Sequence, residues 1–240
     1  MTHLEHQRLG AQGPTLLFFN GFRMPMSSWQ PVADQVAEKA QCVLFNRPGI
    51  GRSPKAEIHQ TGEVVVDMAH ELATDLTLKS PLVLVAHSVG GIFANLYART
   101  FPDQVAGIVF VDATHPEEVM AQKQIKPPGL LHGINQWLKA IEKMIYPLKY
   151  SEDECMGQTI EQIHGADDFP DIPITVISGT QKMPFVPQKN HDIHLDHQQK
   201  LRALSSQSHW IECSGSGHFP QITEPEKVAQ GIVQTLDEIC

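Results

Sequence analysis

The fold of this chain follows from the stretch LVLVAHSVGG, residues 82–91. Its first half is a continuous apolar run, which is typical of a strand buried on both faces of a parallel sheet. Its second half has the pattern small-x-Ser-x-Gly, with Ala86 in the first small position and Ser88 at the centre. This pattern predicts a nucleophile elbow, a sharp strand-to-helix turn that presents the serine hydroxyl above the sheet edge. Small residues are needed there because the chain crowds itself on both sides of the turn.

Apolar runs of strand length alternate with segments of helical periodicity along most of the chain. We expect strands at residues 15–19, 42–45, 82–86, 105–111, 172–177 and 209–213. We expect helices at residues 29–37 (capped by Ser27 or Ser28), 65–76, 92–97 and 225–239. This alternation predicts an α/β fold with a mostly parallel central sheet and helices on both faces. The carboxyl ends of such strands meet at one edge, where open α/β sheets bind their ligands.

The alternation is interrupted between residues 113 and 170. We expect one apolar-rich helix from Leu130 to Tyr146 and a second helix through Met156, which begins at a capping box from Ser151 to Glu154. The segment is too short to form an independent domain. We therefore expect a core formed by residues 1–112 and 171–240, with residues 113–170 inserted as a short helical lid.

The composition of the chain excludes several classes of function. The 240 residues carry a formal net charge of −9, which disfavours nucleic acids and anionic membranes as partners. No apolar run reaches the length of a membrane span, and the first residues lack the features of a signal peptide. The four cysteines lack metal-ligand spacing. We therefore expect a cytoplasmic monomer or homodimer that acts on a small molecule without a metal or cofactor.

A serine nucleophile on this fold needs an acid and a histidine, in that order, further along the chain. His218 follows the last expected strand in a glycine-rich loop and is the candidate base. Asp112 ends the strand at 105–111, on the same edge as Ser88, and we favour it as the acid that orients the histidine. Asp192 and Asp196 stay open as alternatives, although they lie in a segment that we expect to be helical.

Backbone N–H groups must stabilise the negative oxygen that forms when the serine attacks a carbonyl. Val89, the residue after the nucleophile, is one candidate donor. Phe22, in the loop after the first long strand, is the other, and Gly21 allows that loop to turn inward. We expect the substrate to contact Gly21, Phe22, Leu138 and Phe219.

Five further histidines are interpreted as structural. His191, His194 and His197 recur every three residues without completing an ordinary metal site, which favours a solvated face of a helix. His87 and His115 flank the candidate site in sequence, and we interpret them as packing or supporting residues.

Four motifs in this order resemble those of the α/β-hydrolase superfamily, in particular its small, lid-bearing, esterase-like members. They are Asn20-Gly21-Phe22 (with Asn in place of the family's His), the turn Asn46-Arg47-Pro48-Gly49-Ile50-Gly51-Arg52-Ser53 (with Asn in place of Asp), the elbow at residues 86–91, and Gly217-His218. The resemblance covers nearly the whole chain and implies the α/β-hydrolase fold.

The resemblance also bears on the acid and on the nucleophile. Many members carry the acid after the strand that corresponds to residues 172–177, where this chain has no carboxylate. Others, including haloalkane dehalogenases and some lipases, carry it on the preceding strand, where Asp112 stands. Dehalogenases and epoxide hydrolases use an aspartate nucleophile, so Ser88 argues against both activities.

Together these residues predict a serine hydrolase that cleaves a small or medium acyl ester through an acyl-enzyme. Hydrolysis of a carbon–carbon bond, an amide or a lactone is an alternative. A cofactor-free dioxygenase of heteroaromatic rings and a receptor for small ligands are two more. The fold alone does not decide among these functions.

Overall fold

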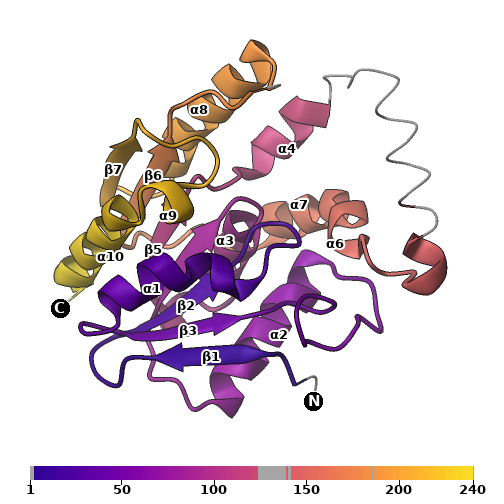
Figure 1. The fold of residues 1–240 in the computed structure, drawn as a ribbon, viewed down its shortest axis with the longest axis horizontal. Helices are drawn as coiled ribbons and strands as arrows, with labels where there is room; N and C mark the ends of the chain where they lie inside the picture. The colour runs from indigo at the N-terminus through magenta and orange to yellow at the C-terminus, as the bar shows by residue number, and fades with distance from the viewer. Residues whose placement is uncertain (1–2, 124–138, 140–141, 185, 240) are drawn as a thin grey trace.

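The computed structural model describes residues 3–123, 139, 142–184 and 186–239, which form one central sheet with helices on both sides (Figure 1). Its strands are β1 (His6–Leu9), β2 (Thr15–Phe19), β3 (Gln41–Phe45), β4 (Leu82–His87), β5 (Val105–Val111), β6 (Ile174–Gly179) and β7 (Ser208–Cys213). They lie in the order β1-β3-β2-β4-β5-β6-β7, and among them only β1 runs antiparallel to its neighbour. The predicted fold class is confirmed.

The helices form two layers that cover the sheet. They are α1 (Gln30–Val36), α2 (Gly62–Asp75), α3 (Gly90–Thr100), α4 (Pro116–Lys123), α6 (Ser151–Glu154), α7 (Met156–Gly165), α8 (Gln188–Arg202), α9 (Pro220–Thr223) and α10 (Pro225–Ile239), with short 3-10 turns at Met26–Trp29 and Pro102–Gln104. Alternate residues of each strand face opposite layers. Leu17 and Phe19 pack with residues of α2, α3 and α7, whereas Leu16 and Phe18 pack with α1 and α10.

The long apolar strands lie close to their predicted positions. β2 and β5 have the predicted bounds, and β4 extends one residue further, to His87. β6 begins at Ile174 rather than 172, because Pro173 has no N–H to donate to a neighbouring strand. The edge strand β1 was not predicted, since only Leu9 among its residues is apolar.

Two predicted helix starts are wrong. The segment after Pro25 is a 3-10 turn, in which the Ser28 hydroxyl donates to the Pro25 carbonyl instead of capping α1. Ser151 lies inside α6, where its hydroxyl accepts the Gln60 N–H at 3.3 Å, so it begins no capping box. Both serines bond to groups outside the helix that they were expected to cap.

The segment between β5 and β6 contributes in part to the core. Met156, Ile160 and Ile163 of α7 are buried in the same cluster as residues of α2 and α3. The predicted helix at 130–146 falls mostly outside the described residues, and the lid stays a prediction. Among the helices that the structure describes, none is long and apolar enough to cross a lipid bilayer.

Candidate active site

Ser88 occupies the turn between β4 and α3 in a left-handed backbone conformation, with φ of 53°. The glycines after it are required by close packing. A Cβ on Gly90 would lie 2.5 Å from the Phe19 carbonyl oxygen, and one on Gly91 would lie 2.6 Å from the Cβ of Ala113. The helix can therefore start directly behind the serine only because these positions carry no side chain.

Three side chains from distant parts of the chain form a hydrogen-bonded row. The Ser88 hydroxyl lies 2.9 Å from Nε2 of His218, whose Nδ1 lies 2.7 Å from Oδ2 of Asp112. They come from the end of β4, the loop after β7 and the end of β5. The alternative acids Asp192 and Asp196 are exposed on α8, where Asp192 accepts a hydrogen bond from Gln188. A row of this kind can activate a serine hydroxyl.

Asp112 is a buried carboxylate held in a fixed orientation. Its backbone adopts a φ of 42°, and its Oδ1 accepts the Gly179 N–H at 2.8 Å. Burial by itself raises the pKa of Asp112, but its contacts with His194 and His218 outweigh this and hold the pKa below its ordinary value. The group is therefore ionised at neutral pH and can orient a histidine.

His218 lies on a loop that packs closely against the sheet edge. A Cβ on Gly179 would lie 1.8 Å from the Gly217 carbonyl oxygen, so the two segments need glycine to approach. His87, buried beneath, donates from Nε2 to the His218 carbonyl at 2.7 Å. Burial and the neighbouring His218 lower the pKa of His87 to about 3, so its ring is neutral and acts as a structural support.

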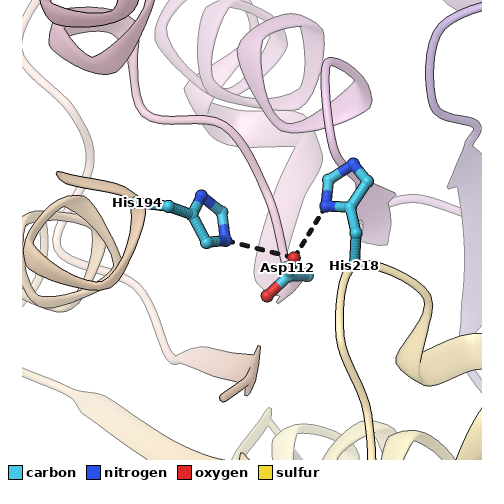
Figure 2. Close-up of side chains that lie close together, drawn as sticks. All are labelled: Asp112, His194 and His218. Carbon is cyan, nitrogen blue, oxygen red and sulfur yellow. Dashed lines mark hydrogen bonds and ion pairs between the residues drawn. The ribbon is translucent and has the colours of Figure 1, made fainter. Parts of the chain in front are cut away.

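His194 was not predicted at this site, and the prediction that its helix face is solvated is wrong. Its Nε2 lies 3.1 Å from Oδ2 of Asp112, and its Nδ1 lies 2.8 Å from Oε1 of Glu118 (Figure 2). The side chain is only 15% exposed, and His197 is buried as well. Helices α4 and α8 pack together, which covers the face that carries both histidines. In the sequence, the recurrence of histidine every three residues at 191, 194 and 197 was the only feature that pointed to His194.

Within the described part of the chain, two clusters of side chains bring together atoms that can bind metals: Asp112, His194 and His218, and His115, Glu117 and His197. In the first cluster both imidazoles approach the same carboxylate oxygen, so a protein atom fills the space between them (Figure 2). In the second cluster, the Glu117 carboxylate pairs with Lys200. The backbone N–H of Glu117 donates to Nδ1 of His115. Protein partners therefore already engage these ligand atoms.

A cavity of about 410 Å³ opens beside Ser88 and His218. Its wall consists of strand ends, the start of α4 and the first turns of α8. The lining residues are Ser88, Asp112, Thr114, Glu118, Gly179, Gln181, Met183, Val186, Pro187, Asn190, His191, His194, Gly217 and His218. Sequence reasoning missed the contribution of α8, because its polar sequence resembles that of an exposed helix.

The residues predicted to contact substrate lie elsewhere or are not described. Phe22 is 37% exposed and lines a separate hollow with Arg23 and Glu152. Phe219 packs against the rings of His87 and His218. Gly21 is buried beside His87, and Leu138 lies outside the described residues. Their contacts with a substrate remain predictions.

Comparison with known proteins agrees with the fold described above. A family model described as alpha/beta hydrolase fold matches residues 14–139, more than half of the chain. The chain belongs to the α/β-hydrolase family. A thermophilic esterase from Thermogutta terrifontis has a similar structure, with a TM-score of 0.66 and 20% identity over 98% of this chain and 93% of the esterase. At that identity the likeness shows the fold.

Two relatives in sequence extend the comparison. The uncharacterised protein YqjL of Bacillus subtilis is 23% identical over 99% of this α/β-hydrolase and 89% of its own length. The pimeloyl-[acyl-carrier protein] methyl ester esterase of Aeromonas salmonicida is 28% identical to this chain. The aligned part covers 55% of this chain and 50% of that esterase. Esterases thus occur among the relatives of this α/β-hydrolase.

A buried arginine holds the loop that carries the candidate oxyanion donor of this α/β-hydrolase. Arg47 donates to the Asn20 carbonyl at 2.8 Å and to the Gly21 carbonyl at 3.1 Å. It also pairs with Glu152 through two hydrogen bonds, of 2.7 and 3.0 Å. The Gly21 carbonyl and the Phe22 N–H share one planar peptide unit, in which they point in opposite directions. By fixing the carbonyl, Arg47 also fixes the direction of the N–H.

Replacing Arg47 with methionine should lower the free energy of unfolding by about 3–5 kcal/mol, because it leaves the Glu152 carboxylate buried without its cation. The side chains are 1% and 9% exposed. Urea unfolding of Arg47→Met measures this loss. The control is Arg52→Met, which removes an 87% exposed arginine that pairs with Glu5 and should change the midpoint little. Equal shifts in the two variants would contradict the argument.

Proposed function

We propose that this α/β-hydrolase is a serine hydrolase that cleaves a small or medium acyl ester through an acyl-enzyme. The observation that carries the proposal is the row from the Ser88 hydroxyl through His218 to Asp112, which lines an open cavity. Nucleophile, base and orienting acid each lie within hydrogen-bond distance of the next, as acyl transfer requires.

In the proposed mechanism His218 acts first as a base and then as an acid. Its Nε2 takes the proton of Ser88 while the oxygen attacks the ester carbonyl, and the N–H groups of Phe22 and Val89 stabilise the resulting oxyanion. The imidazolium then protonates the departing alcohol, which leaves an acyl-enzyme. Water, deprotonated by the same nitrogen, releases the acid and restores the serine. Asp112 holds the ring and stabilises its charge throughout.

Three further observations support an acyl ester of modest size. The cavity volume of about 410 Å³ falls within the range of small-molecule sites. Met183, Val186 and Pro187 supply apolar surface, while Gln181 and Asn190 supply amide groups for orientation. The Aeromonas salmonicida relative is named as a methyl ester esterase, which is consistent with an ester substrate here.

A fluorophosphonate probe tests the proposed nucleophile directly, because it bonds covalently to an activated serine. We expect the probe to label Ser88, as located by mass spectrometry of peptides, and to abolish turnover of short p-nitrophenyl esters. If Ser88 is labelled but the protein turns over amides, lactones or diketones and not esters, the nucleophile is supported and the proposed ester substrate is wrong. A protein that is not labelled at Ser88 and hydrolyses none of these would contradict the mechanism.

A further inference from the structure

Asp112 is shared by two histidines, and the second of them has no part in the mechanism above. His218 bonds to Oδ2 at 2.7 Å, and His194 approaches the same oxygen at 3.1 Å from the opposite side (Figure 2). The other nitrogen of His194 bonds to Glu118 at 2.8 Å. His194 thus lies between two carboxylates, beside a histidine that must bind and release a proton.

We propose that His194 is a positioning residue: held as a cation between Asp112 and Glu118, it cancels the charge of Glu118 and keeps His218 neutral and ready to act as a base. The inference rests on the proposed function, since it concerns the proton on His218. It adds a charged pair, His194 and Glu118, to the row that begins at Ser88.

The backbone holds both carboxylates where they are. Asp112 receives the Gly179 N–H on one oxygen, and Glu118 receives the His115 N–H at 3.4 Å in the first turn of α4. Both side chains are 2% exposed. Two buried carboxylates that each approach one nitrogen of the same imidazole favour its charged form.

The pKa of His194 agrees with a charged ring. Burial lowers that pKa, but Asp112 and Glu118 outweigh burial and raise it to about 10. The pKa rises because a base gains anionic partners. The positive charge of His194 is therefore present throughout the neutral range and is lost only as the pH rises through about 10. Among the residues that the structure describes, the titratable groups that face His194 are Asp112, Glu118 and His218, with the neutral His87 beyond them and His191 on its own helix.

The charges of this group then follow from its members. Counted over these four side chains alone, Asp112 and Glu118 contribute −2 and His194 contributes +1, so the four together carry −1 while His218 is neutral. The group becomes neutral when His218 takes the serine proton. Without His194 the charge beside His218 would be −2, which favours a proton on His218 before substrate binds. The rings of His194 and His218 are 6.1 Å apart, close enough for this effect.

Opposite charge changes on the two partners should shift the pH profile in opposite directions. We expect His194→Gln to move the acidic limb of kcat/KM for a p-nitrophenyl ester up by about one pH unit, and Glu118→Gln to move it down by a similar amount. The double variant restores the net charge of −1 and should return the limb close to its original position. The matched control is Lys200→Gln, which removes another α8-to-α4 ion pair, at 2.7 Å to Glu117, and should not shift the limb.

A purely structural role for His194 would lower kcat without these opposite shifts. Shifts in the same direction, or none, in His194→Gln and Glu118→Gln would therefore overturn the inference. The proposed function fails separately, if Ser88→Ala retains full turnover. Should His194→Gln not fold, ring 15N NMR titration of the unmodified protein and of Glu118→Gln decides: we expect His194 to stay protonated above pH 8, and a titration near its ordinary pKa would refute the proposal.

Discussion

Replacing Ser88 with alanine should reduce kcat for short p-nitrophenyl esters by about 10⁴-fold or more, with little change in stability. The change removes only the hydroxyl that lies 2.9 Å from Nε2 of His218 and leaves the turn, the cavity and the remaining pair intact. Alanine tolerates the φ of 53° about as well as serine, so the elbow should keep its shape. Steady-state release of p-nitrophenol by the purified protein measures turnover, and thermal unfolding checks that the variant is folded.

The control for this variant is Ser28→Ala, which removes an exposed hydroxyl far from the cavity and should leave turnover unchanged. Substantial ester turnover in Ser88→Ala would show that the serine is not the nucleophile. If Ser88→Ala instead consumed oxygen with a quinolone substrate as fast as the unmodified protein, the His218–Asp112 pair alone would carry the chemistry. That result would favour the cofactor-free dioxygenase over the esterase.

Replacing Asp112 with asparagine should reduce kcat/KM by about 10⁴-fold. An amide group faces Nδ1 of His218 as readily with its NH₂ as with its oxygen, so the ring is no longer held with its lone pair toward Ser88. The same change leaves His194 with only one of its two carboxylate partners, Glu118. Steady-state kinetics on the purified variant measures the loss, and circular dichroism checks that the fold is kept.

Asp192→Asn and Asp196→Asn provide the matched comparison, because both change an aspartate to asparagine on the exposed face of α8. We expect each to retain nearly all of the original kcat/KM. A large loss in either of them, with turnover preserved in Asp112→Asn, would assign the acid to α8 and contradict the geometry proposed here.

The sequence predicted most of the sheet because buried parallel strands leave a local signal. β2 and β5 are continuous apolar runs, and their bounds were predicted correctly. The order of Ser88, Asp112 and His218 along the chain could also be predicted, since each lies within five residues of the end of a predicted strand. β1 left no such signal: at the edge of the sheet it is only half covered, so polar residues are tolerated there.

Local sequence patterns could not predict which residues the helices contribute to the site. His191, His194 and His197 look alike in sequence, yet His191 and His194 line the cavity, only His194 of these three pairs with two carboxylates, and His197 is buried. Which of them meets Asp112 depends on the angle and rotation at which α8 packs on α4. Arg47 is a similar case, because its motif predicted only a turn. Its contacts with Glu152 and with the Asn20 carbonyl depend on where α6 and the loop after β2 lie.

Local patterns in the sequence were enough to predict the long apolar strands, the elbow at Ser88 and the sheet edge where Asp112 and His218 emerge, because periodicity and glycine placement act over a few neighbouring residues. The packing of distant elements brings two histidines to Asp112 and places Glu118 against the second. His194 and Glu118 are 76 residues apart, and His218 and Asp112 are 106 apart. Contacts over such separations form when whole helices and strands pack, and the packing depends on the entire core rather than on any local stretch.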